Sequence, residues 1–142
     1  MRASVRRTAV VATAVAALAA LSTTPASAAT PAEICGSGYV QIDSRTLQNS
    51  STVLARIHLL HNASNGNNCV VTMHAPATAG FALPTGAWLT VQGSTTKKDQ
   101  RTYSSYAGPV RASAAGKCVR WGGMIEAGVG EYTYTSPWEH CG

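Results

Sequence analysis

A segment near the middle of the chain carries the pattern that most narrows the folds open to it. In residues 52–61, apolar and polar side chains alternate with the period of a half-buried β-strand. One face of this strand would carry Val53, Ala55, Ile57 and Leu59. Residues 69–74 form a second, β-branched run, and the asparagine- and glycine-rich residues 62–68 separate the two. Strand, Asn-Gly loop and strand together predict a β-hairpin.

The rest of the chain adds further short strands and no sustained helical period. We expect strands at 38–43, 87–92, 102–113 (bent or interrupted at Gly108-Pro109), 117–121 (ending at Gly122-Gly123) and 131–135. Residues 30–33 are expected to be a loose terminus, and the charged residues 97–101 a solvated loop. About seven short strands separated by glycines predict an all-β fold: a small single-domain sandwich or barrel.

The first 28 residues have the three parts of a secretory signal peptide. Arginines at 2, 6 and 7 precede an uncharged apolar run at 9–21, and the small-residue stretch that follows ends in Ala26-Ser27-Ala28. The apolar run is shorter than the roughly 20 residues that span a bilayer, so we expect no stable membrane insertion after cleavage. The sequence therefore predicts a signal peptide at 1–28, a mature domain at 29–142 and a secreted product.

The four cysteines predict two disulfides in this exported domain. An even number of cysteines in a small secreted chain indicates a disulfide framework, and the wide spacing of these four excludes the close pairs typical of a zinc site. Three connectivities are possible. Sequential pairing is favoured because it closes loops of intermediate length and ties the N-terminal strand to the hairpin. That pairing joins Cys35 to Cys69 and Cys118 to Cys141.

The residues predict no active site, cofactor or metal centre. His58 and His61 would point to opposite faces of one strand, and Glu126 and Glu131 are expected to be separated by a turn. No nucleophile motif or phosphate-binding glycine pattern is present. With three arginines in the first seven residues, the mature part keeps eight basic and six acidic residues, too weak a charge to indicate nucleic-acid binding. We expect a protein that is not an enzyme.

The aromatic residues leave binding open. Three tryptophans and five tyrosines could fill the core of a domain with a single phenylalanine, or could form an exposed platform for sugar rings. Trp121 and Tyr106 are the candidate contact residues for a cell-wall polymer or a spore-coat partner. The alternative function is a secreted module that binds a carbohydrate or inhibits a protease.

Four stretches of the chain look like one known family. They are residues 35–39 (CGSGY), 68–72 (NCVVT), 106–110 (YAGPV) and 117–123 (KCVRWGG). In these stretches the chain resembles the spore-associated protein A family of filamentous actinobacteria. The resemblance runs from Cys35 to about Gly123 and brings no catalytic residues. It implies an exported protein found at the spore or aerial cell surface, so we expect an exported, non-catalytic surface-associated protein.

Overall fold

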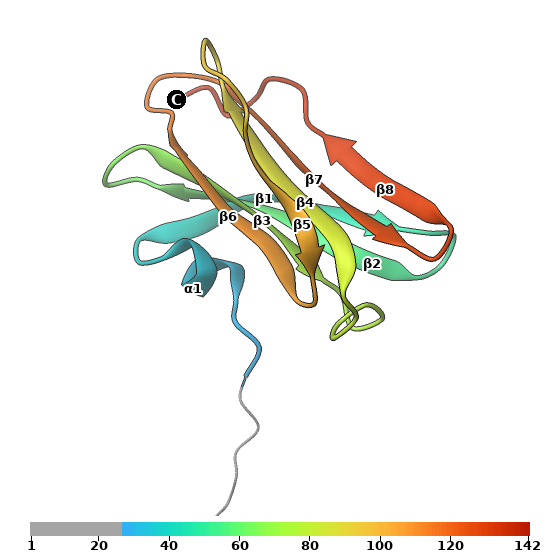
Figure 1. Ribbon diagram of the computed structural model, residues 1–142. Coiled ribbons are helices and arrows are strands. Elements are labelled where there is room, and N and C mark those ends of the chain that lie inside the picture. Colours follow the sequence, from blue (N-terminus) through green and yellow to red (C-terminus); the bar gives the residue numbers. More distant parts are fainter. Residues whose placement is uncertain (1–26) are drawn as a thin grey trace, which may run out of the picture.

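A computed structural model of the chain describes residues 27–142 (Figure 1). Eight strands form two antiparallel four-stranded sheets that pack face to face, with one short helix beside them. Sheet A has the strand order β1-β2-β3-β6, and sheet B has the order β5-β4-β7-β8. The all-β sandwich predicted from the sequence is confirmed, with eight strands rather than about seven. The predicted signal peptide, residues 1–28, lies almost wholly outside the described residues.

The elements have the following bounds. They are α1 (Pro31–Cys35), β1 (Tyr39–Gln48), β2 (Val53–Asn62), β3 (Asn67–His74), β4 (Leu83–Val91), β5 (Lys97–Tyr103), β6 (Tyr106–Ser113), β7 (Val119–Ala127) and β8 (Gly130–Thr135). In the part of the chain that the structure describes, no helix has the length and apolar character needed to cross a bilayer.

The predicted hairpin is β2 and β3, and it contributes much of the core. Asn62 pairs with Asn67 at the base of the loop, where Gly66 takes a positive φ of 71°. Ile57 and Leu59 are fully buried between the sheets, as the alternation predicted. Sheet B meets them with inward side chains of β4 and β7, among them Leu89 and Trp121. Burial of each leucine or isoleucine side chain in this core stabilises the fold by about 1.5–3 kcal/mol.

The outer face of sheet A has a cover of its own. Residues 30–33, expected to be loose, belong instead to a capped helix: the Glu33 amide donates to Thr30 Oγ1 (3.3 Å), and the Thr30 amide donates to Glu33 Oε2 (2.7 Å). A five-residue helix is not stable alone. Here the Cys35–Cys69 disulfide fastens it to β3, and Arg111 donates to the Cys35 carbonyl oxygen (2.8 Å).

Strand β5 and the start of β6 differ from the prediction. The charged residues 97–101 lie in β5, because they pair with β4, Lys98 opposite Trp88. The break expected at Gly108-Pro109 lies instead at Ser104-Ser105. Pro109 is tolerated inside β6 because that strand is an edge of sheet A, paired only with β3 and bulged at this point.

Strand β7 continues through Gly122-Gly123, where the sequence predicted its end. The glycines are there for close packing rather than for a turn. A Cβ on Gly122 would lie 2.1 Å from the carbonyl oxygen of Tyr134, and one on Gly123 would lie 2.1 Å from Thr72 Oγ1. Strands β1 and β4 also extend beyond the predicted bounds, since the additional residues pair with neighbouring strands.

Candidate functional site

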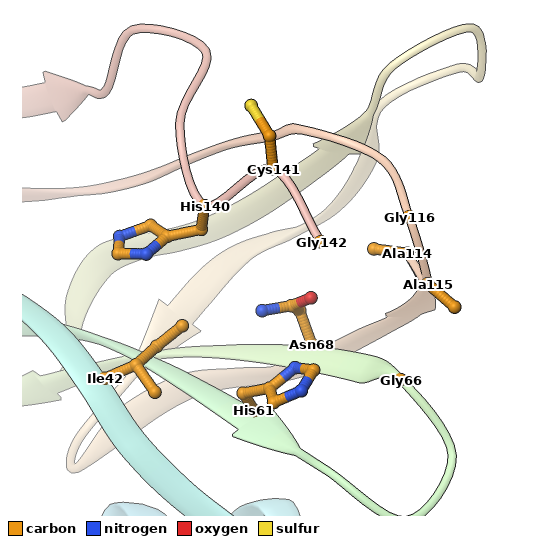
Figure 2. A pocket seen from close by; sticks show the side chains of 10 residues that line it. All are labelled: Ile42, His61, Gly66, Asn68, Ala114, Ala115, Gly116, His140, Cys141 and Gly142. Carbon is orange, nitrogen blue, oxygen red and sulfur yellow. The ribbon is translucent and has the colours of Figure 1, made fainter.

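One cavity lies at an open end of the sandwich, between the β2–β3 hairpin and the C-terminal tail (Figure 2). Its volume is about 460 Å³, within the range of small-molecule sites. One side is formed by the β2–β3 hairpin, with His61 and Asn68, and the other by the tail of the chain. The complete lining is Ile42, His61, Gly66, Asn68, Ala114, Ala115, Gly116, His140, Cys141 and Gly142.

A disulfide fixes the tail wall of this cavity. Cys118, just before β7, is joined to Cys141. Backbone hydrogen bonds between Val119 and Glu139, at 2.9 and 3.0 Å, hold the same segment against the start of β7. Both disulfides therefore have the sequential connectivity that the sequence analysis favoured. The lining is mostly apolar, so the cavity could hold a small apolar molecule with His61 and Asn68 as polar contacts.

An acidic and imidazole cluster lies beside the cavity. His140 Nε2 is 2.9 Å from Asp43 Oδ2, and Glu139 Oε1 accepts a hydrogen bond from the indole of Trp121 (2.7 Å). One ligand atom from each of Asp43, Glu139 and His140 lies within 4.8 Å of the others, which is compatible with one divalent cation. Sequence reasoning missed this cluster because Asp43 and His140 are 97 residues apart.

His58 and His61 are placed on opposite faces of β2, as the strand phase predicted. His61 lines the cavity at the open end of the sandwich, while His58 lies on the outer face of sheet A, so the two share no site. His58 Nδ1 hydrogen-bonds Gln41 Oε1 (2.6 Å). Burial of its ring, together with the nearby Arg56 guanidinium, lowers the pKa of His58 to about 4. His74 is hydrogen-bonded to the Thr78 carbonyl oxygen (3.0 Å) and to Thr85 Oγ1 (2.8 Å).

The prediction that Trp121 contacts a partner is wrong, because its side chain is buried. Trp121 is only 1% exposed, because it points inward from β7 and packs edge-to-face on Tyr134, so it offers no surface to a partner. Tyr106 is half-buried and packs on the cluster beneath α1. The turn expected between Glu126 and Glu131 is present at Gly128, but it does not keep the two residues apart. They lie directly opposite each other across the β7–β8 hairpin, since the turn between them folds one strand back on the other.

Two other tryptophans form a groove on the outer face of sheet B. We call it the tryptophan groove, and its volume is about 380 Å³. It is lined by Trp88, Thr90, Thr96, Lys98, Arg120, Thr135 and Trp138. The Arg120 guanidinium carbon lies 4.7 Å from the centre of the Trp138 ring, and Lys98 Nζ lies 5.3 Å from that of Trp88. The sequence analysis left an aromatic platform open but did not single out these two rings, because Trp88 and Trp138 are 50 residues apart and only the fold brings them together.

Comparison with known proteins supports the resemblance seen in the sequence. The chain is 38% identical over 93 residues to spore-associated protein A of Streptomyces coelicolor. The matched region covers 65% of this chain and 56% of the relative, so the chain spans about half the length of the protein it matches. No protein-family model matches the chain, and no solved structure matches it.

Proposed function

We propose that this chain is an exported protein that associates with the exterior of the spore or cell and acts there by contact, without turning over a substrate. The observation that carries the proposal is the 38% identity to a protein named for its association with spores. The partners that fit such a location are polymers of the cell wall or components of the spore coat.

Export is supported by two independent features. Residues 1–28 combine a basic head, an apolar run and an Ala-x-Ala end. All four cysteines are joined in disulfides, which persist in oxidising surroundings outside the cytosol. A disulfide-bonded sandwich also suits survival outside the cell, where slow unfolding protects a protein from proteolysis.

A role without catalysis is supported by the bonds of the reactive side chains. The thiols are oxidised, and three of the four histidines are hydrogen-bonded within the fold: His58 to Gln41, His74 to Thr85 and His140 to Asp43. A nucleophile needs a neighbouring base that is itself oriented by a third group. In residues 27–142, no hydroxyl or thiol is hydrogen-bonded to the His140–Asp43 pair.

Localisation tests the proposal directly. The full chain is produced in a spore-forming actinobacterium, and medium, mycelium and spores are fractionated. We expect the protein in the spore or surface fraction with an intact mass that begins at Ala29 or within a residue or two of it. A matched variant lacking residues 2–28 should stay in the cytosol. Retention of the unprocessed full chain inside the cell would contradict the proposal.

An activity assay tests the proposal that the protein acts without turning over a substrate. The purified protein is incubated with peptide, glycan and ester substrates, next to the variants Asp43→Asn and His140→Gln. We expect no turnover by any of the three proteins. Turnover by the parent protein that is lost in either variant would identify an enzyme and contradict the proposed role without catalysis.

A second candidate function is a secreted carbohydrate-binding module. The tryptophan groove favours it, because indole faces next to hydroxyl groups suit sugar rings. No similar observation in the described residues favours a protease inhibitor. The Cys35–Cys69 disulfide is buried under α1, and Cys118–Cys141 fastens the tail to the start of β7. Tight stoichiometric inhibition of a secreted protease would reverse that preference.

A further inference from the structure

We propose that the tryptophan groove binds an anionic saccharide, a sugar ring that carries a carboxylate or phosphate group. The inference rests on the proposed function in one respect: it assumes that the protein meets this ligand at the exterior of the spore or cell. It deepens the idea of contact at the cell exterior by naming the surface and the chemistry of what that surface holds.

The groove is open because nothing in residues 27–142 covers this face. Helix α1 contacts strands of sheet A, and Figure 1 shows it on that side of the sandwich. Sheet B therefore presents its outer side chains to solvent. Trp138 is 41% exposed, so part of its indole ring is accessible to a ligand.

The Trp88 ring is held in a fixed position. Its indole Nε1 donates to Thr135 Oγ1 (3.2 Å), and the ring lies against Gly122, where a Cβ would come within 2.4 Å of Nε1. A rigid aromatic face loses little conformational entropy when a ligand packs on it. Sugar rings have apolar C–H faces that pack on such aromatic surfaces, so Trp88 and Trp138 supply the apolar half of a saccharide site.

The hydroxyl groups of the groove supply hydrogen bonds. Thr90 Oγ1 on β4 and Thr96 Oγ1, just before β5, are 2.7 Å apart, and Thr135 Oγ1 accepts the hydrogen bond of the Trp88 indole. A hydroxyl can donate one hydrogen bond and accept two, so each retains capacity for a ligand hydroxyl. The combination of aromatic faces and hydroxyls distinguishes this groove from the mainly apolar cavity at the open end of the sandwich.

The charge of the groove selects an anion. Lys98 and Arg120 line it, and no carboxylate does. In the described part of the chain the single ion pair is His140–Asp43, so neither cation is neutralised by an acidic partner. The Nε of Arg120 is buried and has no hydrogen-bond partner among the described residues. Two cations that line one groove without a carboxylate partner favour a ligand with a carboxylate or phosphate group.

The test measures binding of defined saccharides to the full chain purified from the medium of a secreting host. The probes are tetragalacturonate with its neutral methyl ester, and phosphorylated maltotetraose with neutral maltotetraose. Quenching of tryptophan fluorescence and calorimetry report the affinity. We expect at least one anionic probe to bind about tenfold or more tighter than its neutral counterpart. Added salt should reduce this difference in affinity, because it screens the charges. Which anionic probe binds distinguishes a carboxylate ligand from a phosphate ligand.

Matched variants locate the binding. Lys98→Ala and Trp138→Ala should each weaken the preferred probe about tenfold. Lys97→Ala removes the same charge from the next residue, whose ammonium group is bonded to the Arg111 carbonyl oxygen, and Phe81→Ala removes an exposed ring from another loop. Both controls should bind as the parent does.

Three results would overturn the proposal: no binding of either anionic probe, equal binding of the neutral parents, or equal losses in Lys97→Ala and Lys98→Ala. These results concern the purified protein alone, so they would leave a location at the spore or cell surface intact. A cytosolic location with intact binding would contradict the proposed function but support the saccharide site in the tryptophan groove.

Discussion

The outer faces of the two sheets are built in opposite ways. On sheet A, Tyr39, Leu60 and Val71 are buried beneath α1 and the Cys35–Cys69 disulfide, and they form a second apolar cluster. On sheet B, the equivalent face carries Trp88 and Trp138 with cations against their rings and has no cover. A sandwich needs only its inner faces buried, so each outer face is free to serve another purpose. Here one face adds stability and the other offers contact surface.

The largest effect should follow from uncovering sheet A. The double variant Cys35→Ala/Cys69→Ala should lose about 4 kcal/mol of unfolding free energy, because a 34-residue separation is no longer cross-linked in the unfolded chain and α1 is released. Urea denaturation followed by tryptophan fluorescence measures the loss. Non-reducing peptide mapping of the parent checks the pairing, and a peptide joining Cys69 to Cys118 would contradict it. A loss below about 1 kcal/mol would mean that the cover on sheet A is not a stabilising layer.

The second effect tests whether close packing at Gly122 stabilises sheet B, whose outer face has no covering helix. Gly122→Ala should lower the unfolding free energy by about 2–3 kcal/mol, because its Cβ would meet the Tyr134 carbonyl oxygen and the Trp88 ring. Gly130→Ala is the matched control on the same hairpin, where the nearest atoms belong to the movable Tyr132 side chain at 3.2 Å. We expect the control to change stability by less than about 1 kcal/mol in the same denaturation assay. Equal effects would show that close packing at Gly122 does not hold the open sheet.

A smaller effect concerns pH and His58, on the outer face of sheet A. The pKa of His58 is about 4 in the folded protein, below its usual value of 6.5, so between these pH values the unfolded chain binds more protons. Stability should therefore fall as the pH drops through this window, by roughly 1–2 kcal/mol once solvent screening of the half-exposed ring is allowed for. His58→Gln should remove this part of the pH dependence. Chemical denaturation of both proteins at neutral pH and near pH 4 measures the difference, and identical pH slopes would contradict the prediction.

The smallest effect should come from the open face itself. Trp138→Ala should change the unfolding free energy by no more than about 1 kcal/mol, because the ring is partly in solvent and its main contact is the Arg120 guanidinium. Tyr39→Ala, on the covered face, should lower it by about 3 kcal/mol. The two variants are compared in one thermal or urea series. Similar losses would erase the distinction between a stabilising face and a contact face.

The strands were largely predictable from the sequence, and the errors in the strand assignment have a common cause. The alternation in β2 and the Asn-Gly loop after it are local signals, and both predicted the structure correctly. The mistakes fell at Gly122-Gly123, Gly108-Pro109 and residues 97–101, where glycine, proline and charge usually mark turns. At each of them a neighbouring strand overrides the local preference through sheet pairing or close packing.

The sequence by itself determined the two-residue periodicity, the all-β class and the number of cysteines available for disulfides, because each depends on residue types at short spacing. Only the tertiary structure decided that Trp121 is buried while Trp88 and Trp138 share an open groove, and that Asp43 meets His140. The physical reason is that alternation shows which side chains of a strand share a face, but where both faces carry large apolar or aromatic residues it does not show what each face meets. Which face meets the other sheet, which is covered by a helix and which faces solvent depends on strands far away along the chain.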